Sequence, residues 1–178
     1  MKRPAPITGM SQDKDQQRAR NYLSRERGKA FEARIDASLE YYRAHGYAAV
    51  EKTPEPMKPL KDLGQGKFIA CYEKKAQADY KGVMKGGREV VFEAKYTASD
   101  RLTQDRVTPE QTEFMNQHTA LGARCYVIGG FASGNVYLIP WGIWCSMKDL
   151  FGHKYVTEKD IYHCKINTGW NGVLQLFP

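Results

Sequence analysis

Apolar residues recur at every fourth position in the first third of the chain. Phe31, Ile35 and Leu39 have the spacing of side chains that line one side of a helix. We therefore expect a helix from about Gly28, and residues 47–52 follow it as a short strand. This pair would begin the folded part of the protein.

The leading residues 1–20 have no such periodicity. They contain two prolines, a glycine and many polar residues, which is typical of a chain that cannot build a core. The pattern predicts a disordered basic tail here and a single folded domain over residues 21–178.

Three prolines fall within residues 54–59. Proline fixes φ and lacks a backbone donor, so this stretch favours an extended and stiff conformation. We expect residues 53–68 to project from the domain as a stalk, and residues 68–72 to resume a strand.

A hairpin is predicted next. Residues 79–84 and 89–95 are strand candidates, and Gly86 and Gly87 between them supply the positive φ of a tight turn. Side chains alternate along a strand. One face of the second strand would carry Val90, Phe92 and Ala94, and the other Val91, Glu93 and Lys95.

The polar residues 96–107 are predicted to form a loop, after which a second helix begins. Thr108 suits its N-cap, Pro109 its first position, and Gln111 would complete a capping box. Later elements are expected as strands over 124–131, 135–141 and 173–177 and a short helix within 143–151. Together these elements predict an α/β fold, a central mixed sheet flanked by helices.

Composition limits the class of protein. The 178 residues, 42% of them hydrophobic, suffice for one core. No apolar run is long enough to span a membrane, and no apolar leader precedes the domain, so we expect a cytoplasmic protein without a membrane partner. The four cysteines are scattered, which favours free thiols over a zinc site or disulfides.

The charge is unevenly distributed. The net charge is +7 and the pI about 9.2, and residues 1–29 hold eight lysines and arginines against three acids. Such a basic segment favours a polyanionic partner, because cations displace the counterions of phosphates.

Asp79, Glu93 and Lys95 are the candidate catalytic residues. Glu93 and Lys95 would share one face of a strand, and the hairpin would bring Asp79 beside them. Two carboxylates can hold Mg²⁺, and an ammonium can balance charge on a phosphate under attack. The alternative is a cross-strand surface salt bridge without catalytic meaning.

Four motifs together resemble the RecU-type Holliday junction resolvases of the PD-(D/E)xK nuclease superfamily. In order they are Arg27-Gly-Lys-Ala-Phe-Glu32, Thr53-Pro-Glu-Pro56, Asp79-Tyr-Lys-Gly-Val83 and Phe92-Glu-Ala-Lys95. The resemblance implies a restriction-endonuclease-like fold and a homodimer that resolves four-way DNA junctions by paired nicks, leaving 5′-phosphates. It further implies one or two Mg²⁺ or Mn²⁺ ions in each active site, and a stalk that enters the junction.

The resemblance also assigns roles to residues. Asp79, Glu93 and Gln111 would bind the metal, Lys95 would stabilise the transition state, and Glu32 would support the site. The capping box is an equally good account of Gln111. Where the family has hydroxyl residues before the Asp-Tyr pair, this chain has Gln77-Ala78. Gln77 would then offer a carbonyl to the metal or leave that contact to water, as in a divergent or phage-borne member.

DNA contacts are expected from basic residues of the leading segment, the stalk and the hairpin. These are Arg25, Arg27, Lys29, Lys58, Lys61, Lys67 and Lys81. The three tryptophans, Trp141, Trp144 and Trp170, could stack on bases, although core or dimer packing is the more ordinary role.

Three other functions stay open at this point. One is a different PD-(D/E)xK nuclease that cuts branches or flaps. Another is a junction-binding recombination accessory without catalysis, which would act with other recombination proteins. The third is an RNA-binding module that uses the basic segment.

Overall fold

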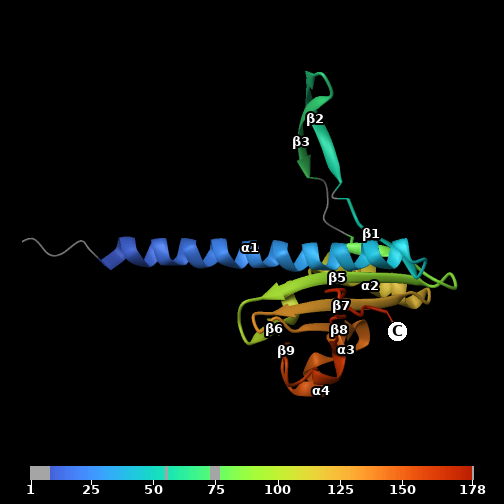
Figure 1. Ribbon diagram of the computed structural model, residues 1–178. Coiled ribbons are helices and arrows are strands. Elements are labelled where there is room, and N and C mark those ends of the chain that lie inside the picture. Colours follow the sequence, from blue (N-terminus) through green and yellow to red (C-terminus); the bar gives the residue numbers. More distant parts are fainter. Residues whose placement is uncertain (1–8, 55, 73–76, 178) are drawn as a thin grey trace, which may run out of the picture.

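The computed structural model describes residues 9–54, 56–72 and 77–177, with side chains from residue 15 onward (Figure 1). Its centre is a six-stranded sheet in the order β1-β4-β5-β7-β8-β10. The strands are β1 Ala48–Lys52, β4 Tyr80–Met84, β5 Glu89–Thr97, β7 Arg124–Phe131, β8 Val136–Pro140 and β10 Lys165–Ile166. β5 and β7 are parallel and the other neighbours are antiparallel, so the mixed α/β sheet that the sequence predicts is confirmed.

Helices cover both faces of this sheet. α1 (Gly9–Ala44) runs across one face, and α2 (Pro109–Ala120), α3 (Trp141–Cys145) and α4 (Met147–Phe151) lie on the other side (Figure 1). Each face has its own hydrophobic cluster. Val90, Phe92 and Ala94 belong to the cluster under α1, and Val91 belongs to the opposite one. The predicted alternation along β5 is therefore confirmed, with both faces buried as a central strand requires.

α1 begins much earlier than the sequence pattern predicts. The disordered tail expected over residues 1–20 is wrong for residues 9–20, which are helical, while residues 1–8 lie outside the described part of the chain. At 1.5 Å per residue, the 36 residues of α1 extend about 54 Å. Forming the first turn of a helix is unfavourable, and here the packing of Phe31, Ile35 and Leu39 in the core stabilises that turn. The straight-chain residues before them then extend the helix at a small cost in free energy per residue.

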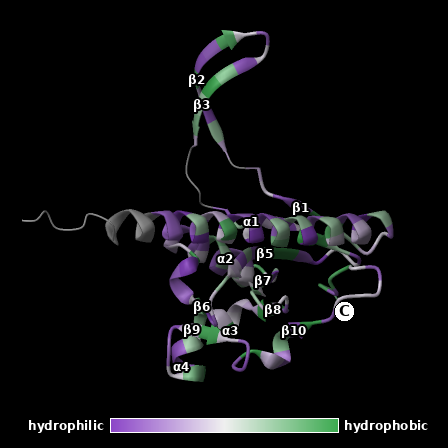
Figure 2. Ribbon diagram, turned by 60° about the vertical axis from the view of Figure 1, so that its left-hand side comes forward, coloured by the Kyte–Doolittle hydropathy of each residue, from purple (hydrophilic) through white to green (hydrophobic). Residues whose placement is uncertain are grey.

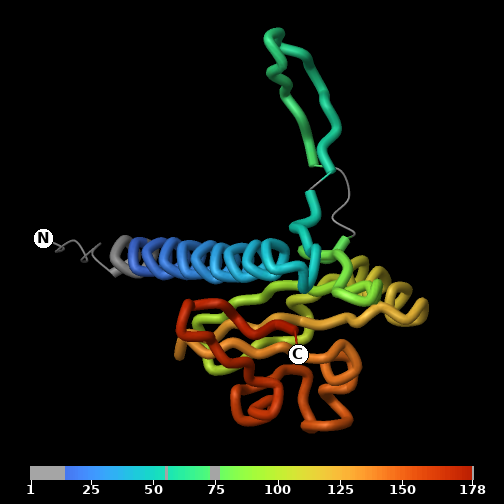
Figure 3. The backbone as a smooth tube through the Cα atoms, turned by 45° about the vertical axis from the view of Figure 1, so that its right-hand side comes forward, coloured from blue at the N-terminus to red at the C-terminus, as the bar shows by residue number. Residues whose placement is uncertain are grey.

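The stalk projects from the β1–β4 edge of the domain (Figures 1 and 3). It is a two-stranded antiparallel hairpin of β2 (Met57–Gly64) and β3 (Lys67–Tyr72), and every residue of both strands is exposed. The strand expected over residues 68–72 is confirmed as part of β3, but it is the returning strand of the stalk, so the stalk extends beyond the expected residues 53–68.

Opposite residues in the stalk share a face, and the two faces differ. One carries the pairs Lys58–Cys71, Lys61–Ile69 and Gly64–Lys67, so its three lysines lie together. The other carries Met57–Tyr72, Pro59–Ala70 and Asp62–Phe68 and is mostly apolar. Figure 2 shows this mixture of hydrophilic and hydrophobic residues along the hairpin.

Residues 96–107 are more ordered than the predicted loop. β5 continues to Thr97, and β6 (Arg101–Thr103) pairs with β9 (Tyr155–Thr157) before a short 3-10 helix, Gln104–Arg106. The fully buried Leu102 holds this segment in the core, which a single apolar residue among polar ones does not reveal.

The C-terminal segment also differs from expectation. Residues 173–177 form no strand, and only an isolated bridge joins Thr168 to Leu174. Leu174 and Leu176 are nevertheless buried against the α1 face. A second 3-10 helix, Tyr162–Cys164, precedes β10. No helix in the described ranges is long and apolar enough to cross a membrane.

Candidate active site

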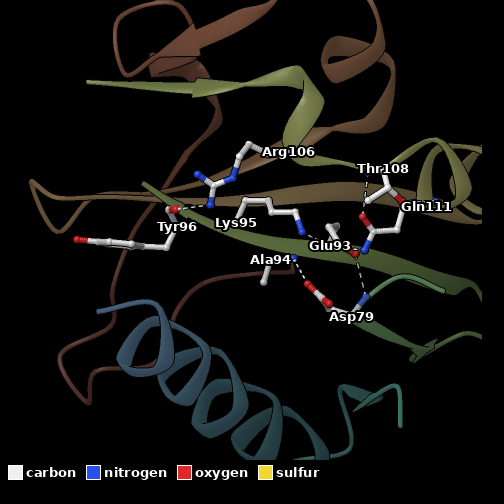
Figure 4. Close-up of polar contacts among 8 residues, drawn as sticks. All are labelled: Asp79, Glu93, Ala94, Lys95, Tyr96, Arg106, Thr108 and Gln111. Atoms are coloured by element: carbon white, nitrogen blue, oxygen red, sulfur yellow. Dashed lines mark hydrogen bonds and ion pairs between the residues drawn. The ribbon is translucent and has the colours of Figure 1, made fainter. Parts of the chain in front are cut away.

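The antiparallel pairing of β4 with β5 sets the site. Tyr80 lies opposite Phe92, so Asp79 and Glu93 come next in register. The Glu93 carboxylate accepts a hydrogen bond from the Asp79 backbone N–H at 3.0 Å, and the Asp79 carboxylate accepts one from the Ala94 N–H at 3.0 Å. This reciprocal pair fixes both carboxylates beside each other (Figure 4).

Glu93 is fully buried, an unusual place for a carboxylate. Burial, and next the negative charge of Asp79, raise the pKa of Glu93 from 4.5 to about 7. The nearby Lys95 ammonium opposes this shift. A buried carboxyl whose pKa is raised by burial and by a neighbouring carboxylate is typical of a functional site.

Lys95 projects on the same side of β5 as Glu93. Its Nζ donates to Glu93 Oε1 at 2.5 Å, and its side chain is 17% exposed. The ammonium therefore points at the buried carboxylate, as Figure 4 shows. This differs from a surface salt bridge, because the acidic partner is wholly removed from solvent.

Gln111 joins the site from the first turn of α2. The predicted capping box is formed: Gln111 Oε1 accepts from Thr108 N–H at 3.1 Å, and the Thr108 hydroxyl accepts from Gln111 N–H at 3.2 Å. In addition, Gln111 Nε2 donates to Glu93 Oε1 at 2.6 Å. The side chain thus caps the helix and holds the Glu93 carboxylate at once.

A cavity of about 340 Å³ opens beside these residues. Asp79, Ala94 and Lys95 form its floor, and Arg25 of α1 and Arg106 reach its walls. The Arg106 guanidinium donates to the Tyr96 carbonyl at 3.0 Å, which holds it over the strand (Figure 4). Sequence reasoning missed Arg106, because nothing marks it within the polar stretch before α2.

Glu32 lies at the edge of the same cavity, as its predicted supporting role requires. Its carboxylate is paired with Lys52 at 2.6 Å rather than with Asp79 or Lys95. Through this pair it joins α1 to β1 at the base of the stalk.

Gln77 is not among the residues that line this cavity. It is exposed, and its side-chain oxygen accepts from Lys81 Nζ at 2.9 Å on the outer surface. Among the described residues, no cluster of three or more histidines, cysteines or acids could hold a metal.

The other predicted basic residues are spread over three surfaces. Arg25 reaches the cavity, and Lys29 is paired with Glu26 on exposed α1. The side chains of the expected DNA-contacting residues outside the cavity are all exposed: Arg27, Lys29, Lys58, Lys61, Lys67 and Lys81.

Comparisons with known proteins extend over most of the chain. The family model described as Recombination protein U (RecU) matches residues 26–174. The Holliday junction resolvase RecU of Streptococcus pneumoniae (strain Hungary19A-6) is 32% identical over 121 residues, which cover 64% of this chain and 61% of that protein. The chain therefore matches about three fifths of the length of this relative.

Two further similarities are more distant. The Holliday junction resolvase RecU of Streptococcus oralis is 29% identical over 144 residues, 77% of this chain and 71% of that protein. Among solved structures, Archaeoglobus fulgidus Hjc, a Holliday junction resolvase, has a TM-score of 0.47 and 14% identity, over 77% of this chain and 88% of Hjc.

Proposed function

This chain belongs to the Recombination protein U (RecU) family, and from that premise we propose that it is an endodeoxyribonuclease that resolves four-way DNA junctions. The observation that carries the proposal is the convergence of Asp79, Glu93 and Lys95 beside a cavity with two arginines in its walls. The names of the streptococcal relatives support the same activity.

The donor set fits a divalent cation that keeps most of its water. Mg²⁺ commonly binds through one or two carboxylates together with substrate phosphate, and Mn²⁺ accepts the same ligands. Asp79 and Glu93 are two such carboxylates, and Lys95 already places a positive charge against Glu93. We infer that these acids would hold one or two Mg²⁺ or Mn²⁺ ions. Gln111 would orient Glu93 in that role through its Nε2 group. Its Oε1 atom already accepts a hydrogen bond from the Thr108 backbone N–H.

Each residue has a distinct part in phosphodiester hydrolysis. When bound, the cation would polarise the phosphate and increase the acidity of a water molecule. Lys95, which lines the cavity, would balance the charge that develops on the phosphate. Arg25 and Arg106 would bind the DNA backbone on either side of the cut, because a guanidinium group can donate two parallel hydrogen bonds to one phosphate. The nick would leave a 5′-phosphate and a 3′-hydroxyl.

Resolution needs two nicks, and we propose that a homodimer provides them. A two-fold dimer would present one site to each of two symmetric strands of a junction. The stalk supports this arrangement, because an isolated hairpin with both faces exposed is marginal in water. Its apolar face suits a second copy, and its lysine face suits the phosphates at the junction centre.

A panel of DNA substrates tests the proposal. We expect the purified protein with Mg²⁺ or Mn²⁺ to nick a four-way junction in opposed strands, in preference to a flap or a linear duplex of the same sequence. Preferred cutting of the flap would instead support a different branch nuclease. A junction that is bound and never nicked across a titration of both metals would identify a non-catalytic accessory, and stronger binding of RNA would identify an RNA-binding module.

A further inference from the structure

A second cavity, of about 1050 Å³, lies away from the active site. Its walls are the end of α1, the turn between β4 and β5, and the C-terminal residues 169–177. Arg88, in this wall, directly precedes β5 and lies five residues before Glu93, which at strand spacing corresponds to about 17 Å. Figure 3 shows the C-terminal segment passing alongside the sheet beneath α1. None of the roles derived above uses this cavity.

The charge of the cavity wall has one sign. Lys85, Arg88 and Arg124 line it, and none of its described lining residues is acidic. Within the described ranges, none of these three side chains has a hydrogen bond or ion pair. Three cations on one wall, with no acidic residue among the described lining residues, favour an anionic occupant.

Aromatic rings complete the wall. Tyr41, Tyr47 and Trp170 line the cavity, and His45 lies between the two tyrosines, with ring centroids 4.0 Å from Tyr41 and 6.2 Å from Tyr47. Trp170 is 99% exposed, whereas Trp141 is 4% exposed and sits in the core. The described residues leave the Trp170 ring exposed, so its face is available to stack on a ligand.

We propose that this cavity binds unpaired nucleotides of a single DNA strand. Single-stranded nucleic acid is recognised by stacking of bases on aromatic rings and by cations that follow the backbone, and both kinds of group meet here. A duplex hides its base faces, so it would use the cations and leave Trp170 idle. The choice of DNA over RNA rests on the proposed function.

A second copy of the chain fits the cavity less well. A two-fold contact brings this patch against the same patch of a second copy, so the cations of both copies enter one interface. Lys85, Arg88 and Arg124 of both copies would then share one interface with no acidic residue among the described lining residues, and like charges in an interface are costly.

The test measures the affinity of the full-length protein for an oligothymidylate of about ten nucleotides. All proteins carry Asp79→Asn, which keeps DNA intact during the measurement. We expect Trp170→Ala to weaken binding by about fivefold or more, because about fivefold is the smallest effect expected from the loss of one stacked base. Trp170→Phe should recover most of the lost affinity. Tyr162→Ala is the matched control, since Tyr162 is also an exposed ring (74%) and lies outside the cavity.

Charge reversal gives a second readout. Arg88→Glu with Arg124→Glu should reduce the slope of log affinity against log salt concentration by about 1.4, the change expected for two lost phosphate contacts on a single strand. Lys148→Glu, an exposed cation of α4, should leave that slope unchanged.

Three outcomes would overturn the proposal. The first is that the Trp170→Ala variant and the double arginine variant bind oligothymidylate as tightly as their control variants do. Another is loss of self-association in Trp170→Ala, by sedimentation, with oligonucleotide affinity kept, which would make the cavity a subunit interface. The third is equal affinity for oligouridylate, which would overturn the assignment to DNA. Junction cutting by the wild-type protein is measured separately, so these failures leave the proposed function untouched.

Discussion

Replacing Glu93 by glutamine should stabilise the metal-free protein at alkaline pH. The folded state raises the pKa of Glu93 from 4.5 to about 7, chiefly by burial and then by the charge of Asp79. A carboxyl with a raised folded-state pKa contributes stability that is fully present below pH 4.5 and lost as the pH rises through 7. Glutamine resembles the protonated carboxyl and does not titrate.

The magnitude follows from the shift. The rise from 4.5 to about 7, at about 1.4 kcal/mol per pKa unit, corresponds to about 3 kcal/mol of unfolding free energy. No discount for solvent screening applies, because Glu93 is fully buried. The wild-type protein should lose this amount relative to Glu93→Gln between about pH 4 and pH 8.

Urea unfolding in a chelator, at several pH values, measures the effect. The control is Glu113→Gln, the same chemical change on an exposed glutamate of α2, whose pH profile should parallel the wild type. Parallel pH profiles for wild type and Glu93→Gln would refute the reasoning, because ionisation of the buried carboxyl would then not lower the free energy of unfolding.

Three further perturbations address the fold around the site. Gly82→Ala should destabilise the protein by about 1–3 kcal/mol in urea unfolding, because the new Cβ would lie 2.0 Å from the Ala49 carbonyl oxygen, and backbone cannot yield cheaply; an unchanged midpoint would contradict this close packing. Thr108→Ala should cost about 1 kcal/mol through loss of the capping box, and should lower cutting as well because Gln111 is then less well held; a stability loss with full cutting would separate the cap from the site. Replacing residues 57–72 by a short glycine linker should reduce preference for junctions more than affinity for duplex DNA, measured by competition binding, and equal loss of both would contradict the stalk's role.

The sequence predicts the parts of the site that local chemistry fixes. Paired glycines at Gly86 and Gly87, both with positive φ, set the hairpin, and alternation along β5 then places Glu93 and Lys95 on one face. The capping box at Thr108 begins α2 at the predicted residue. These features depend on neighbours within a few positions, so one sequence suffices to find them.

Features that depend on distant contacts could not be predicted in the same way. The helical residues 9–20 are polar and carry no period, and their helicity depends on propagation from packed turns further along α1. β6 is held by pairing with β9, more than fifty residues later. Arg106 reaches the cavity only because this segment folds back, and its hydrogen bond to Tyr96 is invisible in the sequence.

The most direct test of the account compares binding and cutting of one four-way junction by wild type, Asp79→Asn and Glu93→Gln in Mg²⁺ or Mn²⁺. We expect both variants to bind the junction with near wild-type affinity and to lose cutting by at least about a hundredfold, because these carboxylates would hold the cation rather than the DNA backbone. Full cutting by either variant would contradict the assignment of the active site to these two acids.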